Sequence, residues 1–250
     1  MASRVYAGID KAYADKCLDA AKKAAEYIEK TPRDTVGYKN PADISTGEYE
    51  DTFTRGKIGS TEVVLSVCGV GKVFAGVCTN TMIVDLGCTH IVNIGVAGSL
   101  DKNIGVGDIV SAKASVQHDM DTSAAGDPVG LISGINVIEL PCDEAFHDKF
   151  AQYLSAKGRT LKTGIIATGD QFISDNARKK EIVSRFGACA VEMEGGAVGQ
   201  ICYANGVPYN IIRMMSDCAN DEADDTYSLN RDDCAVELAD IFTGFLSTLY

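Results

Sequence analysis

Short apolar runs alternate with amphipathic segments from about residue 50 to the end of the chain. Apolar runs that are rich in Val and Ile and stop at glycine or polar residues are typical of buried strands. Segments with apolar residues three and four positions apart are typical of helices packed on one face. The expected strands are 61–72, 90–100, an extended pair in 105–121, 162–172, 188–194 and 207–217, and the expected helices are 73–87, 143–158, 176–187, 195–205 and 232–249.

Strands that alternate with helices need crossover connections, which favour parallel strands covered on both faces. The chain shows no internal repeat, linker or low-complexity segment, and its 250 residues suit one large domain. We therefore predict a single α/β domain spanning residues 1–250. It should have three layers, with a mixed, mostly parallel central sheet flanked by helices.

The first 50 residues fit this alternation less well than the rest of the chain. Residues 10–30 carry the pattern of an amphipathic helix, and a short apolar run at 5–9 is a candidate first strand. Residues 31–51 have the composition of turns, which predicts a long surface segment.

Charge and cysteine content narrow the classes of function. The chain has 23 Lys and Arg against 35 Asp and Glu, a net charge of −12, which argues against a nucleic-acid partner. Its nine cysteines are scattered, with no zinc-type Cys/His spacing, so no metal is implied and a reducing, cytoplasmic location is expected. No apolar run reaches transmembrane length and the first residues contain no apolar leader, so we expect no membrane association.

Five of the expected strand regions end in polar or glycine-rich clusters. In a parallel α/β sheet the carboxyl ends of the strands lie along one edge, where ligands bind. We therefore expect the clusters to meet in space, although about 150 residues separate the first from the last. They are Gly69–Lys72, Gly95–Ser99, Thr168–Phe172, Glu192–Gly196 and Arg213–Asp217.

Each cluster taken alone has a simpler explanation. The GVGK segment lacks the upstream glycine and the Ser or Thr after Lys72 that a P-loop needs, and neither it nor GVAGS fits a dinucleotide fingerprint. Ordinary structural roles also suit several other residues: Asp170 and Ser174 as helix N-caps, Arg213 as an ion-pair partner of Glu192, and His118 as a surface or interface residue.

Three of the clusters contain side chains that suit cleavage of a bond to a sugar. Glu192 and Glu194 alternate along an expected strand and so face the same way, and glutamate can accept hydrogen bonds from two vicinal ribose hydroxyls. Asp217, directly after a buried run, is poorly explained by packing, and with a raised pKa it could protonate a departing purine. Phe172 offers an aromatic face for the base. Together these residues predict a nucleoside site.

Six segments resemble, in order and spacing, the nucleoside phosphorylase and nucleosidase superfamily. They are GKIGSTEVVLSVCGVGKV, HIVNIGVAGSL with IGVGDIV, QHDMD, TGDQFI, VEMEGGAVGQIC and VPYNIIRMMSDCAN. Residues 50–250 look most like the 5′-methylthioadenosine/S-adenosylhomocysteine nucleosidases. The resemblance implies a nucleoside phosphorylase-like fold and hydrolysis of a purine nucleoside to adenine and the free thioribose, without a cofactor.

The resemblance also assigns roles to individual residues. Asp217 would protonate N7 of the purine, with Ser216 beside it, while Arg213 and Glu192 would lie near the reaction centre. The substrate-binding set would comprise Glu194 on the ribose hydroxyls, Met193 against the sugar, Phe172 stacked on the base, the backbone of Ile173 at the edge of the base, and Val70, Val96, Ala97 and Gly98.

The chain departs from the family pattern at three points. Val96 stands where the family usually has a serine that helps to hold the attacking water. The segment 122–133 is small and polar where the family is usually aromatic, which indicates a different 5′ group on the substrate. The N-terminal glutamate that activates the water has no match, and candidates to replace it are Asp10, Asp15, Glu48 and Glu50.

Two other functions remain open, a phosphorylase and an inactive binding protein. The resemblance also implies that the chain forms a homodimer. A purine or uridine nucleoside phosphorylase would need cationic donors for phosphate, for which Arg213, Lys72 and Arg4 are the candidates. An inactive nucleoside-binding or storage protein is favoured by the unmatched N-terminal region, but it would have little need for Asp217. The resemblance implies a homodimer in which the segment 117–130 reaches a partner's pocket.

Overall fold

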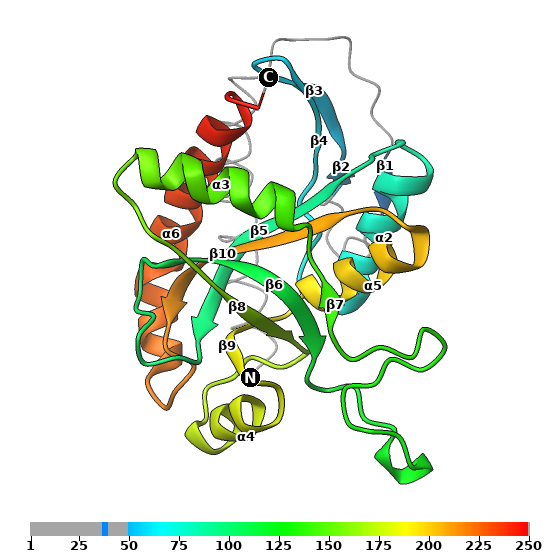
Figure 1. The fold of residues 1–250 in the computed structure, drawn as a ribbon, viewed down its shortest axis with the longest axis vertical. Coiled ribbons are helices and arrows are strands. Elements are labelled where there is room, and N and C mark those ends of the chain that lie inside the picture. The colour runs from blue at the N-terminus through cyan, green and yellow to red at the C-terminus, as the bar shows by residue number, and fades with distance from the viewer. Residues whose placement is uncertain (1–36, 40–49, 250) are drawn as a thin grey trace. The chain divides into compact units, whose positions relative to one another are not determined.

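The structure is a computed structural model that describes residues 37–39 and 50–249 (Figure 1). The chain divides into two compact units, which are described separately. The larger is Val70–Leu238, and the smaller combines residues up to Gly69 with those from Ala239 onward. The prediction of a single domain stays a prediction.

The described residues of the smaller unit include two antiparallel strand pairs. Strands β1 (Gly37–Lys39) and β2 (Glu50–Thr52) pair with each other, so part of the expected surface segment is strand. Strands β3 (Thr54–Ile58) and β4 (Thr61–Leu65) form a hairpin whose turn contains a glycine with φ of +60°. The strand expected over 61–72 therefore ends early and belongs to this hairpin. The strand expected at 5–9 and the helix expected at 10–30 lie outside the described residues.

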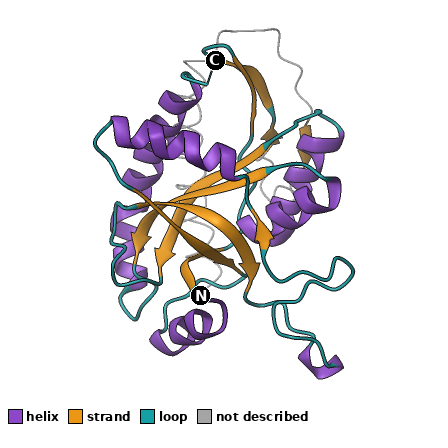
Figure 2. Cartoon of the chain, in the orientation of Figure 1, coloured by secondary structure: helices purple, strands orange, loops and turns teal. Residues whose placement is uncertain are grey.

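Six strands of the larger unit form one mixed sheet, as predicted (Figures 1 and 2). Their order is β10–β5–β9–β8–β6–β7. Strands β5 and β10 run parallel to each other, β6, β8 and β9 run parallel to one another, and the two groups meet in antiparallel pairs. The strands are β5 (Ile91–Ser99), β6 (Ile109–Gln117), β7 (Leu140–Pro141), β8 (Leu161–Thr168), β9 (Ala188–Glu192) and β10 (Tyr209–Asp217).

The sheet is partly closed into a barrel, which corrects the expected three-layer arrangement around a central sheet. Strand β6 pairs with β8 along its length, and its first residues, Ile109–Ser111, also pair with Met214–Ile212 of β10. A register shift at Ala112–Ala114 interrupts β6. Irregularities of this kind increase the local twist of a strand, which lets the two edges of a twisted sheet meet. The expected extended pair over 105–121 is this one bent strand.

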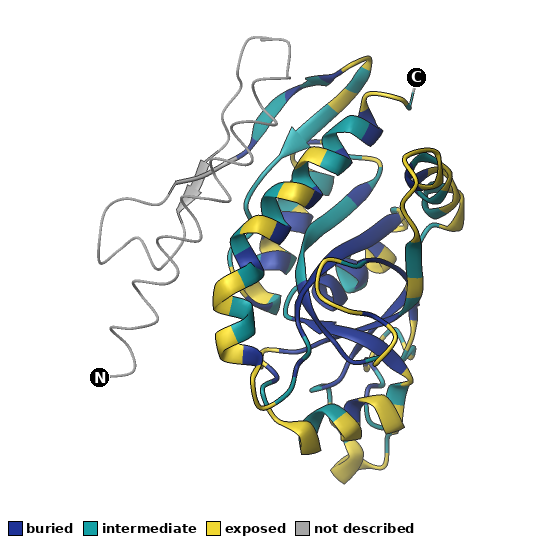
Figure 3. Cartoon of the chain, turned by 90° about the vertical axis from the view of Figure 1, so that its left-hand side faces the viewer, coloured by how far each residue is buried: buried dark blue, intermediate teal, exposed yellow. Residues whose placement is uncertain are grey.

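Strand β10 is the most deeply buried element. All nine of its residues are buried, and it pairs on one side with β5 and on the other with β6. The continuous apolar run is typical of a strand that is covered on both faces. Figure 3 shows that the strands of this sheet are largely buried, while exposed positions gather on helices and loops.

Five α-helices are described, and four of them lie wholly within the larger unit. Helices α2 and α5 pack against each other, and α4 lies against β8 and β9. Asp143 and Asp175 cap α3 and α4, so neither Asp170 nor Ser174 is the N-cap of the helix that follows it. The helices are α2 (Lys72–Val84), α3 (Glu144–Ala156), α4 (Asn176–Phe186), α5 (Gly195–Asn205) and α6 (Ala223–Leu246), the last beginning nine residues before the expected start at 232.

Candidate active site

The carboxyl ends of five strands meet at one place in the larger unit. Register pairs lead from Gln117 at the end of β6 to Thr168 of β8, and from Thr168 to Glu192 of β9. The residue before Glu192 pairs with Gly98 of β5, which pairs in turn with Asp217 of β10. The strand ends converge in a mixed sheet because β5 and β9 pair only near their carboxyl ends.

The GVGK segment joins these strand ends from the start of α2. The backbone N–H of Gly71 donates to Oε1 of Glu194 over 2.8 Å, and that of Lys72 donates to Oδ1 of Asp170 over 2.8 Å. Gly71 has φ of +93°, a conformation that glycine adopts without strain. All five clusters singled out in the sequence are thus brought together.

Glu192 is buried and fully engaged by hydrogen-bond donors. One carboxylate oxygen accepts from the guanidinium of Arg213 and from the backbone N–H groups of Glu194 and Gly195, at 3.1 and 2.7 Å. The other accepts from the hydroxyl of Thr168. A buried carboxylate needs such partners, so Glu192 serves as the structural anchor of Arg213.

Arg213 connects both glutamates from the middle of β10. Its Nη2 contacts Glu192, lies 3.6 Å from Oε2 of Glu194, and donates to the side chain of Asn93. The guanidinium occupies space that opens because residue 95 is glycine, since a Cβ there would overlap Nη1. The first glycine of the GVAGS segment, Gly95, therefore leaves room for the arginine.

Glu194 lies at the N-cap position of α5 and is largely buried. Strand β9 ends at Glu192, so the expected alternation along a strand does not apply, but both carboxylates reach the same arginine. Burial raises the pKa of Glu194, and repulsion from Glu192 raises it further, to about 7. The charge of Arg213 and the N–H of Gly71 act in the opposite direction.

Asp217 is the last residue of β10 and is only 2% exposed. It accepts hydrogen bonds from the backbone N–H of Ala219 at 2.7 Å and from the hydroxyl of Ser216 at 2.9 Å. Burial raises the pKa of this carboxyl, and the two hydrogen bonds offset only part of that effect. A Cβ on Gly98 would lie 2.7 Å from Oδ1 of Asp217, so glycine leaves room for the carboxylate.

The aromatic candidate lies in the loop after β8. Phe172 is 41% exposed and makes an edge contact with the ring of Tyr227, with centroids 5.2 Å apart. Ile173 is buried in a core cluster that includes Leu100 and Val116. The phenyl ring is thus partly exposed, while the buried Ile173 anchors the loop. Met193, between the two glutamates, is half-buried.

The other residues of the predicted substrate-binding set differ in how far they are buried. Val70 is 49% exposed and precedes α2, whereas Val96 is half-buried and pairs in register with Met214. Ala97 is buried, and its carbonyl oxygen accepts from the hydroxyl of Ser216 at 3.4 Å. Asp10, Asp15 and Glu48 lie outside the described residues, and so does the side chain of Glu50.

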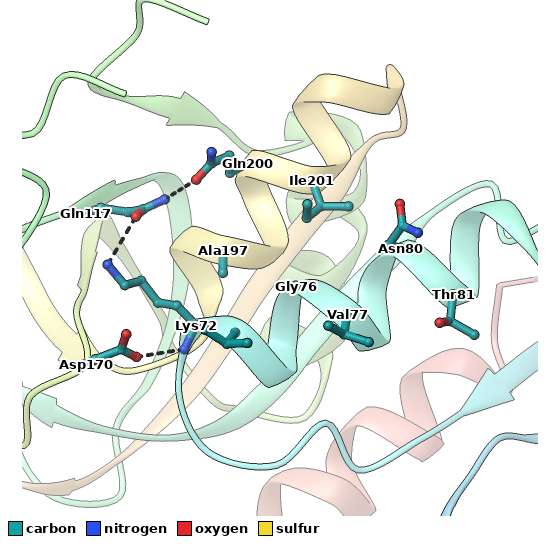
Figure 4. Close-up of a pocket in the computed structure, with 11 residues that line it drawn as sticks. Lys72, Gly76, Val77, Asn80, Thr81, Gln117, Asp170, Ala197, Gln200 and Ile201 are labelled. Carbon is teal, nitrogen blue, oxygen red and sulfur yellow. Dashed lines mark hydrogen bonds between the residues drawn. The ribbon is translucent and has the colours of Figure 1, made fainter. Parts of the chain in front are cut away.

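A polar clamp that the sequence analysis missed holds the GVGK segment. Nζ of Lys72 donates to Oε1 of Gln117 at 3.4 Å, as Figure 4 shows. The same Nζ lies 2.7 Å from Oδ1 of Asp119, and Oδ2 of Asp119 accepts from the backbone N–H of Asp170 at 2.9 Å. Burial acts to raise the pKa of Asp119, but the hydrogen bonds and the charge of Lys72 outweigh it and lower that pKa. The signal in the sequence was a carboxylate two residues after the end of a strand, in QHDMD.

A hollow of about 520 Å³ lies between α2 and α5 (Figure 4). Lys72, Gln117 and Asp170 line one end of it, and Val73 and Ile201 contribute apolar side chains. Glu192, Glu194, Arg213 and Asp217 are not among its lining residues, so the hollow is separate from the carboxylate cluster.

His118 is buried, which corrects the expectation of a surface or interface residue. It packs against Gly169, and its Nδ1 lies 3.3 Å from Nη2 of Arg178. Burial lowers the pKa of His118, and the positive charges of Arg178 and Lys72 add to that effect against the opposing charge of Asp119. The ring is therefore a neutral packing element near neutral pH.

Within 37–39 and 50–249, no three His, Cys, Asp or Glu side chains are grouped so that they could hold a metal ion. Across the same residues, no helix combines the length and the apolar character that a membrane span requires.

Comparison with known proteins places the chain in a family. The model of the phosphorylase superfamily matches residues 17–248. An aminodeoxyfutalosine nucleosidase from Helicobacter pylori is 36% identical over 173 residues, which cover 69% of this chain and 74% of the relative. A 5′-methylthioadenosine/S-adenosylhomocysteine nucleosidase from a Geobacillus strain is 33% identical over 200 residues, or 79% of this chain and 85% of the relative.

A solved structure extends the similarity to nearly the whole chain. The crystal structure of a Francisella philomiragia protein, provisionally named a 5′-methylthioadenosine/S-adenosylhomocysteine nucleosidase, superposes with a TM-score of 0.83 at 30% identity. The match covers 94% of this chain and 95% of that one. The chain therefore belongs to the phosphorylase superfamily, and its similarity to named nucleosidases makes it an N-glycosyl hydrolase.

Proposed function

We propose that the protein hydrolyses the N-glycosidic bond of a purine nucleoside, with 5′-methylthioadenosine and S-adenosylhomocysteine as first candidates, and that Asp217 protonates the departing base. The observation that carries this proposal is a buried carboxyl with a raised pKa beside a pair of glutamates on one arginine. A protonated acid and a hydroxyl-binding carboxylate are what cleavage of a nucleoside needs.

The substrate is held by its two ends. The purine stacks on the partly exposed ring of Phe172, and the backbone of Ile173 meets the edge of the base. The ribose hydroxyls donate to Glu194, which the N–H of Gly71 orients from the other side. Met193 packs against the sugar, and Val70, Val96, Ala97 and Gly98 complete the lining.

The bond breaks as the base accepts a proton. Asp217 donates its proton to N7 of the purine while the bond between C1′ and N9 cleaves, and the electron pair of that bond stays on the base. Positive charge then develops on the ribose ring, where the carboxylate of Glu194 stabilises it. A water molecule adds to C1′ and releases a proton to solvent, which gives the free sugar, and Asp217 takes up a proton from solvent before the next turnover. Ser216 orients Asp217, and the ion pair of Glu192 with Arg213 fixes the floor of the site.

Hydrolysis is favoured over phosphorolysis because the described cationic side chains that could bind phosphate already have carboxylate partners. A phosphate site needs several cationic donors that are available to the anion. Lys72 is held by Asp119, and Arg213 is held by Glu192, so each of these two cations already has a carboxylate partner. The third candidate, Arg4, lies outside the described residues.

The identity of the 5′ group is the part of the substrate that the proposal leaves unassigned. Relatives are named for methylthioadenosine, S-adenosylhomocysteine and aminodeoxyfutalosine. The small, polar segment 122–133 supports a 5′ group other than an alkylthio chain that needs an aromatic cover.

The test is release of the base, followed by chromatography, with and without phosphate. The substrates are methylthioadenosine, S-adenosylhomocysteine, aminodeoxyfutalosine, adenosine and inosine. We expect free base and free sugar at rates that do not depend on phosphate. A sugar 1-phosphate formed only with phosphate would instead establish a phosphorylase. The absence of product from all of these substrates would favour an inactive nucleoside-binding or storage protein.

A further inference from the structure

A lysine that the proposed mechanism does not use ties two strand ends together beside Asp217. Nζ of Lys179, in α4, donates to the carbonyl oxygen of Ser99 at 2.9 Å and to that of Cys218 at 2.6 Å. Ser99 is the last residue of β5, and Cys218 directly follows the last residue of β10. The ammonium group therefore bridges the ends of the two neighbouring strands.

These strand ends need such a bridge because their pairing is irregular there. Strands β5 and β10 pair regularly up to Ala97 and Met215, and the register then shifts so that Asp217 lies opposite Gly98. Two residues after Asp217, Ala219 has φ of +45°, an uncommon conformation for a residue with a side chain. The hydrogen bonds that hold the carboxyl group of Asp217 come from Ser216 and Ala219, so its direction depends on where this irregular end of β10 lies.

We propose that Lys179 is a positioning residue for Asp217, holding the ends of β5 and β10 in the arrangement that directs the carboxyl group at the leaving base. The inference rests on the proposed function, because it concerns the acid of that reaction. The lysine acts through the two backbone carbonyl groups and makes no contact with the substrate. A charge-assisted hydrogen bond is about twice as strong as a neutral one, so an ammonium suits this task.

The same lysine affects the ionisation of the acid. Burial raises the pKa of Asp217, the charge of Lys179 lowers it, and Asp224 in the first turn of α6 raises it. These are the charged groups that act on Asp217 from α4 and α6. A general acid must be protonated to act, so the rate falls as pH rises through its pKa. Removal of the cation therefore moves that limb of the pH profile to higher pH.

The experiment compares three single variants of the full-length protein. Lys179→Met keeps a long, unbranched side chain but removes the donor and the charge, and Lys179→Arg restores both. Lys180→Met is the matched control, because Lys180 is the next residue of the same helix and is exposed. Release of purine is measured across pH for each variant, together with thermal unfolding.

The expected results separate positioning from general stability. Lys179→Met lowers kcat about tenfold with KM changed less than about twofold, because the lost interaction acts on the acid rather than on substrate binding. The alkaline limb of the pH–rate profile of Lys179→Met moves to higher pH, and in Lys179→Arg that limb returns toward its wild-type position. The pH–rate profile of Lys180→Met superposes on that of wild type. Lower thermal stability of Lys179→Met with an unchanged pH limb and kcat would overturn the proposal. If Lys179→Met does not fold, Lys179→Gln replaces it and must show the same displaced limb.

The failure of this inference can be told apart from failure of the proposed function. Wild-type protein that releases no purine, or an Asp217→Asn variant that keeps full turnover, would overturn the function itself. An active wild type and an inactive Asp217→Asn, combined with a Lys179→Met that behaves like Lys180→Met, would overturn only the role of Lys179.

Discussion

Buried charge is concentrated in a few residues whose surroundings decide what each can do. Glu192 is buried and accepts from four donors, whereas Glu194 has fewer partners and a raised pKa. Asp217 is buried with two donors and also has a raised pKa. Among these carboxylates, partner count therefore separates the anchor from the groups proposed to act on substrate.

Replacement of Asp217 by Asn should abolish the acid step. We expect turnover to fall about 10²–10⁴-fold, the usual contribution of a general acid. Asn has the same shape and can still accept from the N–H of Ala219, and the hydroxyl of Ser216 can rotate toward the carbonyl of Ala97. Turnover close to that of wild type would contradict the assignment.

The same variant should become relatively more stable as pH rises. Burial raises the pKa of Asp217 in the folded protein, so folding favours the protonated form. This contribution to stability is fully present below the unfolded pKa and is lost as pH rises through the folded pKa. Thermal unfolding of Asp217→Asn should therefore match wild type in acid and exceed it above the folded pKa. A constant difference across pH would contradict the burial of an ionisable group.

Gly95 should be irreplaceable because of Arg213. Gly95→Ala places a Cβ on the guanidinium, which must move away from Glu192, so we expect a loss of about 1–3 kcal/mol of unfolding free energy. Gly105→Ala is the control, since a Cβ there meets no atom within 4 Å. Denaturant unfolding measures both. Equal stability of the two variants would show that the arginine does not need the space.

At the scale of elements, the sequence predicted most of the larger unit, and its errors have identifiable causes. The run from Tyr209 to Asp217 was clear because both faces of β10 are covered, and glycines marked the ends of α4 and α5. The start of α6 was missed because 223–231 is polar, and Leu229, which is 79% exposed, provides no apolar stripe. The closing pair of β6 with β10 joins residues about 100 positions apart, and no local pattern encodes it.

The sequence predicted which strand ends carry the residues of the candidate site, but it did not predict the contacts between side chains from different segments. The clusters around Glu192 and Asp217 could be found because polar residues follow apolar runs. The pairing of Lys72 with Asp119 could not be found, because it joins segments whose spatial relation depends on the sheet order. The burial of His118 likewise depends on the way Gly169 packs onto its ring.

The N-cap of α4 offers a test at this scale. Asp175 accepts hydrogen bonds from the backbone N–H groups of Ala177 and Arg178, so Asp175→Ala should cost about 1 kcal/mol. Ser174→Ala is the matched control, because Ser174 was a candidate cap in the sequence but does not cap the helix. Denaturant unfolding should show a loss for Asp175→Ala alone. An equal loss in both variants would contradict the observed cap.

At the scale of the whole molecule, a homodimer stays a prediction. The nucleosidase resemblance implies that the segment 117–130 reaches a partner's pocket, and residues 123–126 of that segment are exposed in the chain. Sedimentation velocity should give twice the chain mass of 26.5 kDa. A monomer with full activity would contradict the prediction.

Release of adenine from methylthioadenosine, S-adenosylhomocysteine and aminodeoxyfutalosine in phosphate-free buffer, by wild type and Asp217→Asn side by side, tests the central claim most directly. The account predicts that wild type releases free adenine from at least one of them and that Asp217→Asn releases it at least about a hundredfold more slowly. Adenine released equally fast by both proteins, or by neither, would contradict it.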